Sequence, residues 1–208
     1  MIGLLALLWS LGCVVFEPQP PDVMVVVLDT VRADRLKTYG ARRSTSNQLD
    51  AIGEAGVVFH DVTASGTWTW PSHAALFTGE PPWVSGAHWS EKSDTVDQKT
   101  GFWTVSPMRT DLPTLAERFA DAGYRTVSLA SNSLLDPKLG LTRGFDRAEW
   151  LKRDESVVSA VKSLLTEPDP RPLFLFVISN VRPSGGLCGA EAPAWRTRYC
   201  QLVFAPTE

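Results

Sequence analysis

Histidine and cysteine are scarce in this sequence, which limits the metal sites that it can build. The chain has three histidines and three cysteines among its 208 residues. Three cysteines without clustered histidines do not make a Cys/His zinc site. A surplus of positive charge is also lacking, because the formal net charge is −3 and no basic run occurs. These absences exclude a general attraction to nucleic acid, and we expect no nucleic-acid partner.

A long apolar run is lacking as well. Residues 1–16 are nearly all apolar, but a run this short is typical of a signal-peptide core rather than of a membrane span. Gly12 before Cys13 fits a bacterial lipoprotein cleavage site, with Cys13 lipidated; the alternative is a buried N-terminal helix. We therefore expect an exported protein, periplasmic or anchored to the membrane through Cys13. A proline-rich spacer over residues 17–22 then leads into the folded domain, residues 23–208.

The rest of the sequence is that of one globular domain, without internal repeats or low-complexity tracts. Hydrophobic residues make up 44% of the chain and charged residues 21%. Strand-like and helix-like patterns alternate along it. We expect strands at 23–28, 57–59, 125–130 and 173–178, and helices at 111–122 and 157–165. A further helix, capped by Asn47, carries Leu49 and Ile52 and ends at Gly53 or Gly56. This alternation predicts an α/β fold, a three-layer sandwich with a mostly parallel central sheet.

A carboxylate follows the first apolar run. Residues 23–28 read as a buried parallel strand, and Asp29 comes directly after them. Ligands of open α/β sheets bind beyond the carboxyl ends of the strands, so Asp29 is a candidate metal ligand. Its alternative role is that of a turn residue at the strand end. Asn132, which follows the strand predicted at 125–130, either contacts substrate or closes a turn.

A second candidate is the stretch TWTWPSHAALFTG (67–79), which reads as a loop that becomes a helix. Pro71 suits the first helical position, and Gly79 suits the helix end. The first N–H groups of a helix favour an anion, and the hydroxyl of Thr69 is placed to attack an anionic ester held there. Asp29 and Thr69 could share one metal ion. The other interpretation is a capped helix without chemistry, because threonine is common at helix starts.

Together these stretches resemble the sulfatase family, within the alkaline-phosphatase superfamily. LDTVRAD (28–34) is similar to the family's opening motif, and TWPSH (69–73) with Thr78-Gly79 is similar to its nucleophile motif. Further matches follow in the family's order: TSNQLDAI (45–52), LAE (115–117), AGYRT (122–126) and RGFD (143–146). The resemblance runs from about residue 21 to about residue 180 and implies an alkaline-phosphatase-like fold.

The departures from the family pattern are informative. Thr69 stands where sulfatases carry the Cys or Ser that matures to formylglycine, and His73 replaces an Arg. This pattern resembles the superfamily's threonine-dependent phosphodiesterases and phosphotransferases. The family's distal Asp-His-Gly motif is absent, and FVISNVRP (176–183) lacks the usual histidines. The chain therefore resembles the N-terminal, C-terminally incomplete part of a larger enzyme, or a decayed copy of one.

The resemblance implies a metal-dependent hydrolase or transferase that acts on a phosphate or sulfate ester. Its substrate would be a small-molecule, lipid or sugar ester. Thr69 would be the nucleophile and, with Asp29, a ligand of calcium, magnesium, manganese or zinc. His73 would donate to the anion, and Ser72, Asn132 and His88 would contact substrate. The alternative is a truncated or degenerate domain without catalytic activity.

The last part of the sequence is the least regular. Cys188 and Cys200 either pair, if the protein is exported, or remain free thiols. Residues 195–208 resemble the start of a family helix, so we expect a helix there.

Overall fold

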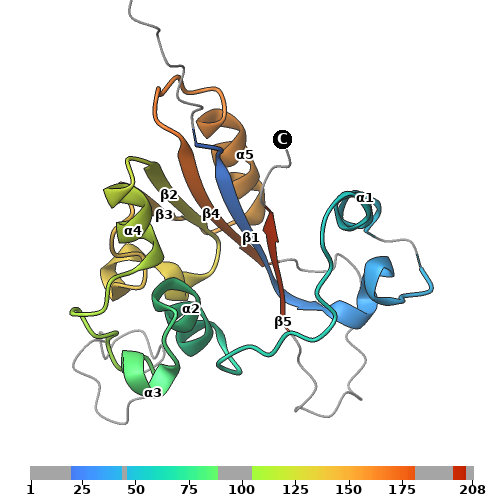
Figure 1. Ribbon diagram of the computed structural model, residues 1–208, viewed down its shortest axis with the longest axis horizontal. Helices are drawn as coiled ribbons and strands as arrows, with labels where there is room; N and C mark the ends of the chain where they lie inside the picture. Colours follow the sequence, from blue (N-terminus) through green and yellow to red (C-terminus); the bar gives the residue numbers. More distant parts are fainter. Residues whose placement is uncertain (1–19, 44–45, 89–104, 181–198, 205–208) are drawn as a thin grey trace, which may run out of the picture.

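The structure, a computed structural model, describes residues 20–43, 46–88, 105–180 and 199–204. Its centre is a five-stranded sheet in the order β3-β2-β4-β1-β5 (Figure 1). The strands are β1 (Val23–Arg32), β2 (Arg125–Ala130), β3 (Arg147–Trp150), β4 (Leu173–Asn180) and β5 (Tyr199–Phe204). The first four run parallel, and β5 pairs antiparallel with β1. The predicted α/β fold with a mostly parallel sheet is confirmed.

The strand register brings the carboxyl ends of three strands to one edge. Asp29 in β1 lies opposite Asn180 in β4, and Ala130 at the end of β2 lies opposite Ile178. The inner residues of β2 and β4 are buried; β4 is almost continuously apolar, whereas β2 also buries the hydroxyl residues Thr126 and Ser128. Asp29 lies within β1, which continues to Arg32, and not directly after the strand as expected. Asp29 and Asn132, the second residue after β2, are nevertheless neighbours in space, although 103 positions separate them in sequence.

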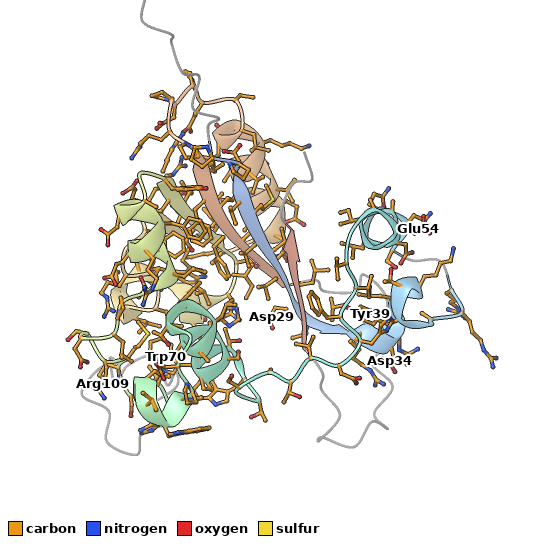
Figure 2. The ribbon with its side chains drawn as sticks, viewed as in Figure 1. Asp29, Asp34, Tyr39, Glu54, Trp70 and Arg109 are labelled. Carbon is orange, nitrogen blue, oxygen red and sulfur yellow. The ribbon has the colours of Figure 1, made fainter. Side chains whose placement is uncertain are left out.

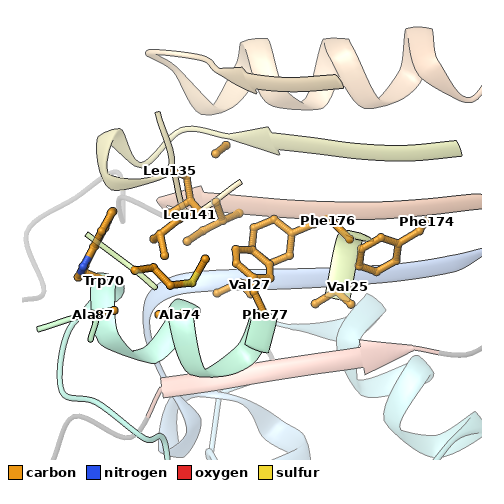
Figure 3. Packing of buried hydrophobic residues seen from close by; sticks show 14 of the residues in the cluster. Val25, Val27, Trp70, Ala74, Phe77, Ala87, Leu135, Leu141, Phe174 and Phe176 are labelled. Carbon is orange, nitrogen blue, oxygen red and sulfur yellow. The ribbon is translucent and has the colours of Figure 1, made fainter. Parts of the chain in front are cut away.

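Helices cover both faces of the sheet and give three layers. On one face lie α2 (Thr69–Thr78) and α4 (Leu115–Asp121), and α5 (Asp154–Leu164) lies on the other (Figure 1). Under α2, the side chains of Ala74 and Phe77 pack on Phe176 and Val27 of the sheet (Figure 3). Under α5, Val157 and Leu164 belong to a second apolar cluster with residues of β2 and β4.

The helix boundaries follow local capping chemistry. Gly79 ends α2 with a φ of 74°, a left-handed conformation that glycine adopts without a steric penalty. At the start of α4, Thr114 and Glu117 form a capping box, in which each side chain accepts from the other residue's backbone N–H. The short helices are α3 (Pro82–Ser85), η3 (Ser133–Leu135) and η4 (Pro137–Leu139).

Residues 33–43 and 46–56 form an outlying segment that stands beside β1 and β5 (Figure 1). It contains η1 (Ala33–Arg35), η2 (Lys37–Tyr39) and α1 (Asn47–Ala55). The buried Asp50 carboxylate accepts bonds from Thr38 and Ser46 and ties these pieces together. The strand expected at 57–59 is wrong, because within the described residues no strand lies beside this segment to pair with it. The Val57 and Phe59 side chains are 81% and 68% exposed.

Several other boundaries correct the predictions. Helix α2 begins at Thr69, so Pro71 is its third residue and not its first. Helix α4 begins at Leu115 instead of 111, because Pro113 disfavours helical backbone at the residue before it. The helix expected within 195–208 is wrong, since Tyr199–Phe204 is β5, which pairs with the edge that β1 would otherwise expose.

Some expectations lie outside the described residues. These are the signal segment 1–16 with Cys13, residues 17–19 of the spacer 17–22, and Cys188 with its pairing to Cys200. Within the part of the chain that the structure describes, no helix is both long and apolar enough to cross a membrane.

Candidate functional site

Three polar side chains converge at the carboxyl edge of the sheet. Asp29 comes from β1, Thr69 is the first residue of α2, and Asn132 follows β2. The Asn132 side-chain nitrogen Nδ2 donates to Asp29 Oδ2 at 2.6 Å and to Thr69 Oγ1 at 3.2 Å. Figure 2 shows Asp29 on the side of β1 that faces α2. The structure therefore joins the predicted acid and the predicted nucleophile through a single amide nitrogen.

The orientation of the Asn132 amide follows from its own bonds. Its Oδ1 accepts the backbone N–H of Leu134 at 2.9 Å, which caps η3. Because an N–H group needs an oxygen acceptor, this bond assigns the oxygen to Leu134 and the NH₂ group to Asp29 and Thr69. The turn role expected for Asn132 and its place at the sheet edge are thus combined in one side chain.

The start of α2 is held by packing on both sides of Thr69. Trp70 is fully buried, and its indole Nε1 donates to the Ser106 carbonyl at 2.9 Å. Gly66 lies against the ring of Pro71, where an added Cβ would come within 2.7 Å of a ring carbon. Any larger residue at position 66 would displace one of these segments. These contacts fix the helix turn that carries the Thr69 hydroxyl.

Thr30, directly after Asp29, has a left-handed backbone with a φ of 64°. A β-branched residue rarely adopts this conformation, which costs about 1–3 kcal/mol. The pairing of β1 with β5 also changes register between Val27 and Arg32. The chain therefore kinks just beyond Asp29, at the point where the strand leaves the sheet edge. Backbone outliers of this kind concentrate at functional sites.

His73 lies one helical turn after Thr69 and is buried. Its Nδ1 lies 2.8 Å from the Thr69 carbonyl oxygen, so Nδ1 carries the proton. Within the described residues, Nε2 has no hydrogen-bond partner. Burial lowers the pKa of the imidazole, which keeps the ring neutral. In this tautomer Nε2 is an acceptor, and the donor role predicted for His73 requires a second proton.

The remaining predicted substrate contacts are placed differently. The Ser72 hydroxyl turns back into the helix and donates to the carbonyls of Trp68 at 2.9 Å and Thr69 at 3.2 Å. His88 follows α3 and is exposed, and its Nδ1 lies 3.4 Å from the Ser106 hydroxyl. Neither arrangement joins these side chains to the hydrogen-bonded group of Asp29, Thr69 and Asn132, so their substrate roles stay predictions.

The donor set can be compared with what a divalent cation needs. Asp29 and Thr69 offer oxygen ligands, but Asn132 presents its NH₂ group between them, and NH₂ does not ligate a cation. Over the described ranges, no group of three or more His, Cys, Asp and Glu side chains gathers. Calcium takes six to eight oxygen ligands and magnesium six. The described residues alone therefore do not fit a divalent cation.

A supporting contact behind the site was not foreseen from the sequence. Asp154, at the start of α5, accepts from the Ser131 hydroxyl at 2.6 Å and from the Ser179 hydroxyl at 2.8 Å. Ser131 immediately precedes Asn132, so this carboxylate braces the ends of β2 and β4. The available signal was that Ser131 and Ser179 are polar residues at the ends of two apolar strand runs.

The chain is similar to known proteins in sequence and in fold. Residues 21–179 match the family model described as Sulfatase. A curated relative, the Δ4,5-hexuronate-2-O-sulfatase of Bacteroides thetaiotaomicron, is 22% identical over 138 residues, which are 66% of this chain and 26% of that protein. The N-acetylgalactosamine-6-sulfatase of Sus scrofa is 32% identical over 69 residues, 33% of this chain and 13% of that protein. The matched regions thus span about a quarter or less of these relatives.

Solved structures share the fold. The chain superimposes with a TM-score of 0.61 and 16% identity on BT4656 in complex with D-glucosamine-2-N,6-O-disulfate, covering 77% of this chain and 34% of that one. The score is 0.57, with 18% identity, for a phosphonate monoester hydrolase of Agrobacterium radiobacter (78% and 41% covered). It is 0.54, with 17% identity, for the zinc complex of the periplasmic domain of EcEptC from Escherichia coli (81% and 46% covered).

Proposed function

Because this chain belongs to the sulfatase family, we propose that it acts on a phosphate or sulfate ester, as hydrolase or transferase, with Thr69 as the nucleophile. One observation carries the proposal. The Thr69 hydroxyl stands at the first residue of α2 and accepts a bond from the same amide that holds Asp29. A hydroxyl, a carboxylate and a helix N-terminus at one sheet edge suit attack on an anionic ester.

The reaction divides into two displacements. Thr69 Oγ1 forms a bond to phosphorus or sulfur, the bond to the ester oxygen breaks, and the alcohol leaves with the proton that the hydroxyl gives up. Water or an acceptor alcohol then attacks the Thr69 ester, and the hydroxyl recovers its proton. The N–H groups at the start of α2 favour the anionic group during both steps.

The identity of the nucleophile favours phosphate over sulfate. Thr69 cannot mature to the aldehyde that sulfatases use, because oxidation of a threonine gives a ketone. A threonine ester of phosphate needs no such maturation. We therefore rank a phosphodiester or a related phosphonate ester first and a sulfate ester second. The organic group is a small molecule, a lipid or a sugar.

A divalent cation belongs to the proposal as a cofactor and not as part of the derived steps. When bound, such a cation polarises an ester and lowers the pKa of a hydroxyl. Asp29 and Thr69 are this chain's candidate ligands, and calcium, magnesium, manganese and zinc are the candidates. The described residues supply too few oxygen ligands for a divalent cation, so neither displacement is assigned to a cation here.

Turnover and covalent labelling test the proposal. The purified chain is assayed with p-nitrophenyl phosphodiester, phosphomonoester and sulfate ester, with and without EDTA, and its metal content is measured. Thr69→Ala should lose turnover by at least about 10³-fold and lose a covalent adduct seen by intact mass. Thr166→Ala, which removes an exposed hydroxyl far along the chain after α5, is the matched control and should keep both. Full activity in Thr69→Ala would overturn the assignment.

A second candidate function rests on the incomplete donor set. A degenerate domain that binds an anion without turnover also agrees with one carboxylate beside Thr69 and with an amide NH₂ between them. In that case the wild-type chain holds no metal, turns over none of the three esters and forms no adduct. It would still bind inorganic phosphate in a way that depends on the α2 terminus.

Export is proposed together with the enzyme function. The short apolar segment 1–16 and Cys13 support it, and the EcEptC relative is described as a periplasmic domain. Cell fractionation with radiolabelled palmitate tests both parts. Export predicts that the chain leaves the cytoplasm, and lipidation predicts labelling that Cys13→Ala abolishes.

A further inference from the structure

We propose that Asn132 is a positioning residue, whose NH₂ group holds the Asp29 carboxylate and the Thr69 hydroxyl in their reactive arrangement. The inference rests on the proposed function and deepens it. It replaces the expected substrate contact of Asn132 with a role that acts through the nucleophile. The inference depends on two hydrogen bonds that Asn132 Nδ2 donates, one to Asp29 Oδ2 at 2.6 Å and one to Thr69 Oγ1 at 3.2 Å.

The hydrogen-bond inventory of Asn132 leaves its NH₂ group no free donor. An asparagine amide has two N–H bonds, and each is directed to one of these two oxygens. Its Oδ1 accepts from the Leu134 backbone, so the amide does not turn over without losing that bond. Because both N–H groups already donate hydrogen bonds within the protein, they are not available to a substrate. The side chain sets the geometry of the groups that it binds.

The backbone that carries Asn132 is held by three different elements. The Ser131 N–H donates to the Ile178 carbonyl in β4 at 3.1 Å, and its hydroxyl donates to Asp154 in α5. The Trp150 indole at the end of β3 donates to the Ser131 carbonyl at 3.3 Å. Each polar group of Ser131 is thus engaged by a neighbouring element. A residue fixed in this way defines where its neighbour's side chain lies.

The two hydrogen bonds from Asn132 Nδ2, here called the bridge, stabilise both oxygens that they reach, Asp29 Oδ2 and Thr69 Oγ1. The Asp29 side chain is buried at 6% exposure, and no lysine or arginine in the described residues forms an ion pair with it. A buried carboxylate without a counter-charge needs strong donors, and a short bond from an amide supplies one. At Thr69, the accepted bond occupies one lone pair and directs the O–H away from Asn132. One hydroxyl rotamer is thereby selected before a substrate arrives.

Nuclear magnetic resonance tests the bridge without any activity. In the 208-residue chain, the two side-chain amide protons of Asn132 should give separate signals, one of them strongly downfield. Asp29→Asn should shift one proton, and Thr69→Val, which keeps the shape but removes the hydroxyl, should shift the other. Asn47, at the exposed start of α1, is the internal control and should not move. If neither variant shifts the Asn132 protons, the inference is wrong.

Kinetics test the positioning role. Asn132→Asp keeps the oxygen that caps η3 but places a second carboxylate oxygen against Asp29 in place of the donors, so it should lower kcat by at least about 10-fold. Asn132→Ala adds no charge, so it should lower kcat similarly and leave KM within about 3-fold at some cost in stability, whereas the control Asn47→Asp, far from the site in sequence, should leave kcat unchanged. A normal kcat in a folded Asn132→Asp overturns the inference. A wild-type chain without turnover, whose Asn132 protons respond to both variants, overturns the proposed function and supports the bridge.

Discussion

The carboxylates at the two ends of the central sheet have different hydrogen-bond partners. At the amino ends of the strands, carboxylates face guanidinium groups, as in the pairs Arg171–Asp169 at 2.9 Å and Arg171–Asp146 at 3.2 Å. At the carboxyl edge, Asp29 is buried, and its bond partner is a neutral amide. Charges that neutralise one another near solvent contribute little and bind nothing further. A carboxylate held by a neutral donor keeps its negative charge available for chemistry.

The comparison also separates two kinds of rigidity. The amino end is tied by a capping box on the buried Thr114 hydroxyl and by the half-buried Arg143–Glu117 pair at 2.8 Å. The carboxyl edge is tied by buried hydroxyls and an amide whose bonds reach across 63 and 103 positions of sequence. Changes at the first end should therefore alter stability, and changes at the second should alter turnover. Three predictions test that division, and a fourth, for His73, concerns the cost of burying an imidazole beside the carboxyl edge; the largest expected effect comes first.

Asp29→Asn should reduce turnover by about 10³-fold, equivalent to about 4 kcal/mol of transition-state stabilisation. The variant keeps the side-chain shape but removes the charge at the site. The matched control is Asp169→Asn at the opposite end, which should keep kcat within about 2-fold. The measurement is kcat on the best of the three p-nitrophenyl esters. Equal losses in both variants would show that the two ends are not functionally distinct.

Gly144→Ala should destabilise the fold by about 2–4 kcal/mol without a specific effect on kcat of the folded fraction. Gly144 has a φ of 90°, and an added Cβ would lie 2.7 Å from the Glu117 nitrogen and 2.9 Å from Thr114 Oγ1. The measurement is urea unfolding of Gly144→Ala and of the control Gly140→Ala. Gly140 has a φ of 87°, and an added Cβ there would have no atom within 4 Å. Gly140→Ala should show only the smaller backbone cost. Equal destabilisation would mean that packing at Gly144 contributes nothing.

His73 should make stability depend on pH below its ordinary pKa. Burial lowers the pKa of the folded imidazole, so the unfolded chain binds the proton more readily. Stability is then full above about pH 6.5 and falls as the pH drops below that value, by at most about 1.4 kcal/mol per pH unit. His73→Asn should flatten this part of the profile, and His88→Asn, at an exposed site, should not. Urea unfolding at a series of pH values decides it, and parallel profiles for wild type and His73→Asn would contradict the prediction.

Arg171→Gln should have the smallest effect, a lowering of Tm by about 2 °C or less that salt screens further. Bonds from the Arg171 side chain and backbone hold the pKa of Asp169 down to about 2. The stabilisation from this pair is present above the ordinary carboxylate pKa and is lost as the pH falls from about 4 to about 2. In the variant, the pKa of Asp169 should rise toward its ordinary value in a pH titration followed by NMR. An unchanged value would assign the shift to other groups.

The fold was predictable wherever local pattern and burial agree. The segments 23–28, 125–130 and 173–178 are strands as predicted, because they pair with one another and lie between the helix layers, and Gly79 ends α2 as its position indicates. The prediction failed at 57–59, where strand-like residues have no described neighbour to pair with. It failed again at 199–204, where pairing with β1 decides for a strand. Both outcomes depend on neighbours that no local window contains.

By itself the sequence determined the fold class and the order of the main strands and helices. It also indicated that Asp29 and Asn132 stand near the ends of strands and that Thr69 stands at the start of a helix. Those properties follow from side-chain periodicity and backbone chemistry over a few residues. Only the tertiary structure decided that one nitrogen of Asn132 bonds both Asp29 and Thr69, that burial lowers the pKa of His73, and that Ser72 turns back into its helix. The physical reason is that hydrogen bonding and burial depend on which strand ends become neighbours, and strand order is a property of the whole sheet.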